Sequence, residues 1–183
     1  MREAVEHYVG TGKKFDLRVS YSIEHEPLGT GGALKKAGSL LGKDEEQLIA
    51  TYGDLITNLN PLKLVRDLKA DKNGKILGVI AAIPLRSSFG IIDLENGHAS
   101  RFREKPILES YWMNAGVYVF STKVLTSLPE RGNFESETLP KLAAKRRILV
   151  SKFTRAAWRS MDSHKDVEEA QNEFKDFLPN IDG

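Results

Sequence analysis

Segments with the periodicity of strands and segments with the periodicity of helices alternate along the whole chain. Strand-like runs rich in β-branched and aromatic residues occupy 17–23, 48–52, 75–85, 112–120 and 148–159, and helix-like runs occupy 33–41, 60–71, 136–146 and 163–177. This alternation predicts an α/β fold in which a mostly parallel sheet lies between helices. Ligands of such sheets bind at the carboxyl ends of the strands. Residues that directly follow a strand are therefore the first candidates for a site.

One stretch departs from the alternation. Residues 89–94 and 99–102 both read as strands, and they flank the sequence Glu95-Asn96-Gly97. Asn-Gly between two apolar runs is a strong signal for a hairpin turn. We therefore expect a small antiparallel element around residues 88–104.

Composition narrows the classes of protein. A chain of 183 residues fits one domain, so we expect a single domain over residues 1–183. The net charge of +2 is too small to indicate a nucleic-acid partner, and the absence of cysteine excludes disulfides and thiolate metal sites. No apolar run is long enough to cross a membrane, and the charged first residues lack the apolar core of a secretory signal. These features favour a cytoplasmic protein without a membrane partner.

Two glycine-containing turns follow predicted strands. The first, Glu26-Pro27-Leu28-Gly29-Thr30-Gly31-Gly32, leads into a helix, where free N–H groups favour an anion. A simple tight turn explains this pattern equally well. The second turn carries Asp54 directly after a strand, and a carboxylate there can bind Mg²⁺. The alternative is that Asp54 only caps the backbone that follows.

Three later segments also place polar groups near strand ends. Glu104 and Lys105 stand in a charged loop before a proline, where the lysine suits a phosphate and the glutamate suits sugar hydroxyls; an exposed charged loop is the alternative. Asn114 lies with a glycine inside an apolar strand, which indicates close approach of a ligand or of another backbone. Asp162 lies between a strand and a helix, where it could share a metal ion with Asp54 or simply cap the helix.

The order of these motifs resembles the sugar-1-phosphate nucleotidyltransferases, a family that includes glucose-1-phosphate thymidylyl- and uridylyltransferases and mannose-1-phosphate guanylyltransferases. The motifs are Glu-x-x-Pro-Leu-Gly-Thr-Gly-Gly-Ala, Gly-Asp, Phe-x-Glu-Lys-Pro, Asn-Ala-Gly-x-Tyr-x-Phe and Trp-x-x-x-Asp. The likeness extends from the first residues to the last helix. It implies a Rossmann-like nucleotidyltransferase fold, with a nucleoside triphosphate and a hexose-1-phosphate as substrates.

The resemblance also implies a role for each group of residues. It assigns the base and ribose of the nucleotide to Glu24, Pro27, Leu28, Gly29 and Gly53. It assigns the sugar and its phosphate to Gly90, Glu104, Lys105, Asn114 and Gly116. The catalytic residues would be Asp54, Lys105 and Asp162, with Asp54 and Asp162 as the Mg²⁺ ligands. The implied reaction is attack of the sugar phosphate on the α-phosphorus, which releases pyrophosphate.

One family feature is missing from this sequence. The family begins with a strand and a Gly-Gly-x-Gly-Thr-Arg-Leu-Arg-Pro-Leu loop that grips the triphosphate, and neither occurs here. Relative to the family, the chain is expected to lack its first strand or strands, as a truncated form or as a natural remnant. We therefore expect little turnover by this chain alone, and the open sheet edge favours a homo-oligomer. The alternative function is a non-catalytic chain that binds sugar nucleotides or pairs with a full-length enzyme. A third interpretation is an unrelated doubly wound enzyme in which these motifs coincide.

Overall fold

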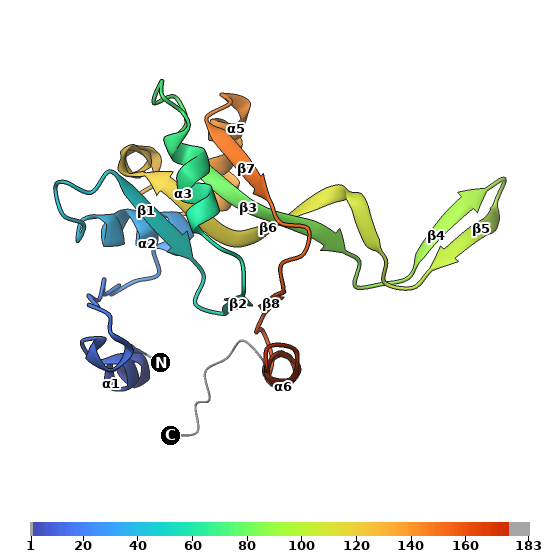
Figure 1. The fold of residues 1–183 in the computed structure, drawn as a ribbon, viewed down its shortest axis with the longest axis horizontal. Helices are drawn as coiled ribbons and strands as arrows, with labels where there is room; N and C mark the ends of the chain where they lie inside the picture. Colours follow the sequence, from blue (N-terminus) through green and yellow to red (C-terminus); the bar gives the residue numbers. More distant parts are fainter. Residues whose placement is uncertain (1, 176–183) are drawn as a thin grey trace. The chain divides into compact units, whose positions relative to one another are not determined.

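A computed structural model describes residues 2–175 of the chain (Figure 1). The chain divides into two compact units. The first comprises the residues up to Glu46 together with Thr122–Lys145, and the second comprises Gln47–Ser121 together with the residues from Arg146 onward. The organisation as a single domain stays a prediction.

The first unit is helical in the part of the chain that the structure describes. Its elements are α1 (Arg2–Val9), the 3₁₀-helix η1 (Lys13–Phe15), α2 (Gly29–Gly38), the 3₁₀-helix η2 (Thr122–Ser127), α4 (Phe134–Glu137) and α5 (Leu139–Ala144). The strand expected over 17–23 is wrong. That segment is held by isolated bonds, such as Val19 N–H to the Thr11 carbonyl at 3.0 Å, and not by a ladder. Alternating apolar residues alone do not make a strand when no partner strand lies beside them.

The second unit contains all the strands that the structure describes. They are β1 (Gln47–Thr51), β2 (Leu55–Thr57), β3 (Gly78–Arg86), β4 (Ile91–Glu95), β5 (His98–Arg103), β6 (Ile107–Ser121), β7 (Ile148–Lys152) and β8 (Trp158–Ser160). Its helices are α3 (Leu62–Lys69) and α6 (His164–Glu173). The predicted α/β class is confirmed by this architecture.

The main sheet has four strands in the order β1-β6-β3-β7. The strand β6 pairs antiparallel with both β1 and β3, whereas β3 and β7 pair in parallel. The strands β1, β3 and β7 therefore point the same way, and β6 runs between two of them in the opposite direction. The expected mostly parallel sheet is thus a mixed sheet, because a long strand of reversed direction occupies its interior.

The helix α3 covers one face of this sheet. Its start is fixed by Asn60, whose side-chain Oδ1 accepts a hydrogen bond from Leu62 N–H at 3.0 Å. Leu64 and Leu68, one helical turn apart, are buried against alternate sheet residues that include Val79 and Val119. Burial of side chains of this size contributes about 1.5–3 kcal/mol each. This packing holds α3 on the sheet and helps to fix the ends of the neighbouring strands.

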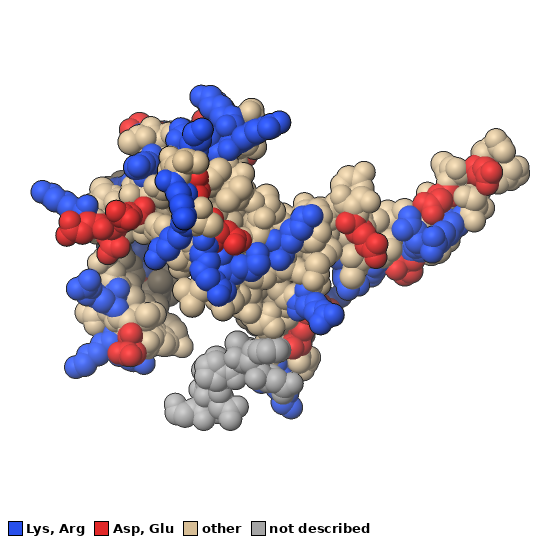
Figure 2. Space-filling model, turned by 45° about the horizontal axis from the view of Figure 1, so that its top comes forward, with Lys and Arg blue, Asp and Glu red and all other residues tan. Residues whose placement is uncertain are grey.

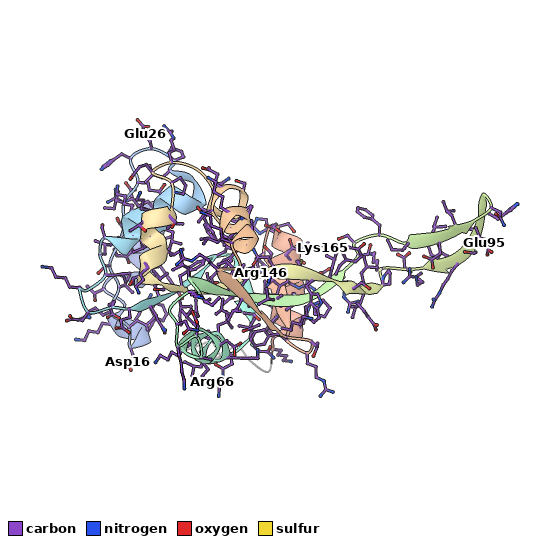
Figure 3. All side chains as sticks on the ribbon, turned by 90° about the horizontal axis from the view of Figure 1, so that it is seen from above. Asp16, Glu26, Arg66, Glu95, Arg146 and Lys165 are labelled. Carbon is purple, nitrogen blue, oxygen red and sulfur yellow. The ribbon has the colours of Figure 1, made fainter. Side chains whose placement is uncertain are left out.

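The predicted antiparallel element is confirmed. The strands β4 and β5 form a separate hairpin, whose tip carries Glu95 (Figure 3). Asn96 and Gly97 at the tip have φ values of 49° and 82°. Two successive positive φ values define the type I′ turn that Asn-Gly sequences favour.

Charges of both signs are present on the protein surface. On the face shown in Figure 2, Lys and Arg side chains are interspersed with Asp and Glu, including along the β4–β5 hairpin. Within residues 2–175, no helix is both long enough and apolar enough to span a membrane.

Candidate functional site

Asp54 and Asp162 lie at adjoining ends of two paired strands. The strands β2 and β8 are antiparallel, with Leu55 opposite Ser160. Beyond that pair the backbones remain bonded, because Met161 N–H donates to the Asp54 carbonyl at 2.8 Å. Residues 108 positions apart in the sequence are therefore neighbours along one short ladder. Both side chains are exposed, so they are accessible to an ion or a ligand.

The helix-capping alternative for Asp162 is wrong, because the next residue fills that role. Ser163 is the N-cap of α6, and its side-chain oxygen accepts a hydrogen bond from Asp166 N–H at 3.3 Å. The Ser163 hydroxyl in turn donates to the Asp166 carboxylate at 2.7 Å, and this hydrogen bond holds the pKa of Asp166 below its ordinary value. The Asp162 carboxylate is thereby left available for another function.

The donor set at this strand end suits a hard divalent cation. Asp54 and Asp162 offer carboxylate oxygens, and Mg²⁺ typically takes one or two carboxylates and completes its shell with water and substrate phosphates. Among residues 2–175 there is no group of three or more Asp, Glu, His or Cys side chains that could hold a metal ion without such help. A metal at this place would therefore depend on the ligand for part of its coordination.

Asn114 and Gly116 stand in a bulge of β6 that faces the turn before Asp54. Ile80 pairs with Tyr118 and Ala82 with Asn114, so three residues of β6 lie opposite the single residue Ala81. The Asn114 side chain fixes this bulge: its Oδ1 accepts from Gly116 N–H at 3.0 Å, and its Nδ2 donates to the Tyr118 hydroxyl at 2.5 Å. The amide and the glycine inside an apolar strand thus have a structural role in the bulge.

The bulge is tied to both strands of the carboxylate pair. A Cβ placed on Gly116 would lie 2.6 Å from a Leu55 methyl and 2.6 Å from the Tyr52 ring. On the other side, the Trp158 indole N–H donates to the Ala115 carbonyl at 2.7 Å. The bulge therefore anchors β2 and β8, and through them the positions of Asp54 and Asp162.

A second group of predicted residues comes together at the base of the hairpin. A Cβ placed on Gly90 would lie 3.1 Å from the Glu104 carboxylate and 2.6 Å from the Phe102 ring, so a larger residue there would displace these side chains. Lys105 follows with a φ of 43°. Such a conformation costs a non-glycine residue about 1–2 kcal/mol, and such outliers concentrate at functional sites. Gly90, Glu104 and Lys105 thus lie at the base of the β4–β5 hairpin, before β6 begins.

The third predicted group, Glu24 to Gly29, belongs to the first unit. The Glu24 carboxylate accepts a hydrogen bond from Leu28 N–H at 2.9 Å and so closes the turn before α2. The glycines after it are inside the helix, which begins at Gly29 and not at residue 33 as expected. A Cβ on Gly29 would lie 2.6 Å from the Gly132 carbonyl, and one on Gly32 would lie 2.4 Å from the Glu130 carbonyl. Close packing therefore explains these glycines, and the nucleotide-binding role of Glu24, Pro27, Leu28 and Gly29 stays a prediction.

A cavity of about 560 Å³ lies in the second unit, between the end of β3, β6, β8 and α6. Of the predicted site residues only Asp162 lines it, and the sequence assigned no binding role to the other polar side chains of its wall. These are Arg86, Ser88, Thr154, Arg159, Ser160, Asp166 and Glu173. A signal was present at Arg86, because a charged residue that closes the long apolar run of β3 stands at a strand end. Volumes of this size accommodate small organic ligands.

Arg159 joins the cavity wall to the helix α6. Its guanidinium contacts Glu169 at 2.6 Å, Glu173 at 3.0 Å and Asp166 at 3.9 Å. Burial opposes its charge, but the hydrogen bonds to Glu169 and Glu173 prevail and raise the pKa of Arg159 above its ordinary value. The positive charge of Arg159 is therefore largely used within the protein, where it fixes α6 against β8.

The sequence of this chain matches a known protein family. A family model described as nucleotidyl transferase matches residues 1–176. The chain belongs to this nucleotidyl transferase family. It is 30% identical over 158 residues to a mannose-1-phosphate guanyltransferase of Yarrowia lipolytica. The aligned residues cover 84% of this chain and 43% of the relative. It is 31% identical over 159 residues to the mannose-1-phosphate guanylyltransferase catalytic subunit beta of Xenopus tropicalis, with the same two shares. The chain thus spans less than half the length of these relatives.

Two solved structures share the fold. A protein of Bacillus anthracis assigned as a glucose-1-phosphate thymidylyltransferase superposes with a TM-score of 0.69 at 16% identity, over 97% of this chain and 73% of that one. HddC from Yersinia pseudotuberculosis superposes with a TM-score of 0.68 at 23% identity, over 94% of this chain and 74% of that one. At such identities the likeness supports the fold and leaves substrates and site residues to be tested.

Proposed function

We propose that this chain takes part in joining a nucleoside triphosphate to a hexose-1-phosphate, with formation of a nucleotide-sugar and pyrophosphate. The observation that carries the proposal is the pairing of Asp54 with Asp162 at the adjoining ends of β2 and β8. Family membership supports the reaction class. The names of the relatives suggest mannose-1-phosphate and a guanine nucleotide as the first substrates to test.

The residues have distinct tasks in this proposal. Asp54 and Asp162 would bind Mg²⁺, which would supply charge neutralisation to the substrate phosphates. Glu104 would accept hydrogen bonds from sugar hydroxyls, and Lys105 would hold the attacking phosphate. Alignment of the two substrates supplies much of the rate in phosphoryl transfer, because no covalent step on the protein is needed. A cytoplasmic location and self-association stay predictions.

A second candidate function is a non-catalytic chain that binds a nucleotide-sugar. It concerns residues 1–183 by themselves, which contain no Gly-Gly-x-Gly-Thr-Arg loop. Loss of one fixed donor to a developing charge costs about 3–4 kcal/mol in other enzymes, and a whole loop supplies several donors. The chain alone would then bind its product without forming it at a useful rate.

Titration calorimetry with GDP-mannose in the presence of Mg²⁺ tests what the two candidates share. We expect saturable binding, and we expect Asp162→Asn to weaken it at least about tenfold, since it loses a charge-assisted contact. A coupled pyrophosphate assay with GTP and mannose-1-phosphate then separates the candidates, because only the enzyme turns over. A folded chain that binds no nucleotide-sugar of any base, including dTDP-glucose, would contradict both.

A further inference from the structure

The cavity of the second unit contains two arginines in very different electrostatic surroundings. Arg159 is contacted by Asp166, Glu169 and Glu173 and is part of the scaffold. Arg86 also lines the cavity, but within the described residues 2–175 no hydrogen bond or ion pair involves its side chain. A guanidinium at a cavity wall with no counter-ion has its five donors available for a ligand.

The backbone around Arg86 is fixed. Arg86 is the last residue of β3 and pairs with Ile107 of β6. The loop after it is closed by Ser87, whose N–H donates to the Pro106 carbonyl at 2.9 Å and whose hydroxyl accepts from Phe89 N–H at 3.1 Å. The base of the Arg86 side chain is therefore held on the rigid end of a strand, as a binding residue should be.

The cavity offers complementary chemistry on its other walls. Ser88 supplies a hydroxyl, Asp162 supplies a carboxylate, and Trp158 and Met113 supply apolar surface. A hexose has both polar edges and apolar C–H faces, and the volume of about 560 Å³ is within the range of small-ligand sites. Lys105, the residue that the motifs suggest for the phosphate, is not among the residues that line this cavity.

We propose that Arg86 binds the phosphate of the hexose-1-phosphate, with the sugar in the cavity between Arg86 and Asp162. This inference rests on the proposed function, and it assigns to Arg86 the phosphate contact that the motifs suggest for Lys105. Arginine suits the role because its planar fork can contact two phosphate oxygens at once, whereas lysine acts as a point charge. Arg159 is excluded from the role because its charge is already compensated by three carboxylates.

The test is calorimetric titration of mannose-1-phosphate into the full chain and into the variants Arg86→Ala, Arg86→Lys and Lys105→Ala. Loss of a hydrogen-bonded ion contact predicts that Arg86→Ala weakens binding about 10- to 100-fold, with partial recovery in Arg86→Lys. The binding of free mannose, which has no phosphate, should be the same in all four proteins. Arg66→Ala, on α3 and away from the cavity, is the matched control and should leave binding unchanged (Figure 3).

Each outcome decides between the two proposals. Unchanged affinity in Arg86→Ala, or a larger loss in Lys105→Ala than in Arg86→Ala, overturns the inference and leaves the proposed function intact. An equal loss for mannose and mannose-1-phosphate also overturns it, because the effect would then not concern the phosphate. No binding of either hexose-1-phosphate, mannose or glucose, by the folded parent chain contradicts both proposals. Circular dichroism of each variant establishes that the fold is retained.

Discussion

Gly116 is the residue at which the bulge of β6 depends most directly on side-chain size. Its φ of 69° lies in the left-handed region that favours glycine, and its Cα faces Tyr52 and Leu55 at distances that leave no room for a methyl group. Backbone strain and steric overlap would therefore both destabilise the fold if any other residue stood at this position. The sequence indicated a close approach here, but it could not say whether a ligand or the protein itself makes it. The structure assigns that approach to Tyr52 and Leu55.

Gly116→Ala should lower the free energy of unfolding by about 2–4 kcal/mol, from backbone strain together with overpacking. Urea unfolding followed by circular dichroism measures this change. Gly53→Ala is the matched control, because a Cβ at Gly53 meets no atom within 4 Å and the residue has no positive φ. Equal stability of the two variants would contradict this account of the bulge.

At the scale of elements, a hydrogen bond to one carboxylate connects α3 with β7. The buried Ser151 hydroxyl of β7 donates to Asp67 of α3, and Lys63 contacts the same carboxylate at 3.2 Å. The hydrogen bond from Ser151, followed by the charge of Lys63, lowers the pKa of Asp67 below its ordinary value of 3.8. A lowered pKa in the folded state means that the ionised carboxylate stabilises the fold.

The sign of the pH dependence follows from that direction. The stabilisation is fully present above the unfolded pKa near 3.8 and is lost as the pH falls through the lower folded pKa. We therefore expect Asp67→Asn to be less stable than the parent chain at pH 7, and the difference to shrink below about pH 4. Urea midpoints from pH 7 to pH 3 measure it, with Asp44→Asn in an exposed loop as the control. A difference that stays constant with pH would show that the Asp67 charge is not involved.

The elements differ in how well the sequence predicts them. The hairpin and β3 were predicted because Asn-Gly and a long apolar run are local signals. The start of α2 at Gly29 was missed because glycines usually interrupt helices, and here packing against residues 129–133 overrides that preference. The direction of β6 was missed for another reason: strand direction depends on long-range pairing that local periodicity does not encode.

The distinction between local signals and long-range contacts applies to the candidate site as well. The proximity of Asp54 and Asp162 was expected because both follow strands and because the motif order resembles the family. The sequence did not predict Ser163 as the cap of α6 or Arg86 in the cavity wall, because both depend on three-dimensional contacts that the local sequence does not encode. Residue types at strand ends thus indicated the chemistry. Which of these side chains are already hydrogen-bonded within the protein, and which are not, could be seen only in the structure.

At the scale of the whole molecule, the proposed chemistry is concentrated in the second unit. It contains the carboxylate pair, the cavity and the group at the base of the hairpin, whereas the turn from Glu24 to Gly29 belongs to the first unit. The proposed function therefore requires the second unit to bind a divalent cation and a phosphate-bearing sugar. The central claim is that Asp54 and Asp162, from strands far apart in the sequence, bind one cation between them.

Mn²⁺ binding followed by electron paramagnetic resonance, with GDP-mannose present, tests that claim most directly, because Mn²⁺ accepts the same oxygen ligands as Mg²⁺. We predict one bound Mn²⁺ per chain, displaced by excess Mg²⁺. Asp54→Asn and Asp162→Asn should each weaken binding at least about tenfold, and the double variant should lose little more than either single variant, since both carboxylates hold the same ion. Asp44→Asn should bind as the parent chain does. Undiminished Mn²⁺ binding by the folded double variant would contradict the account.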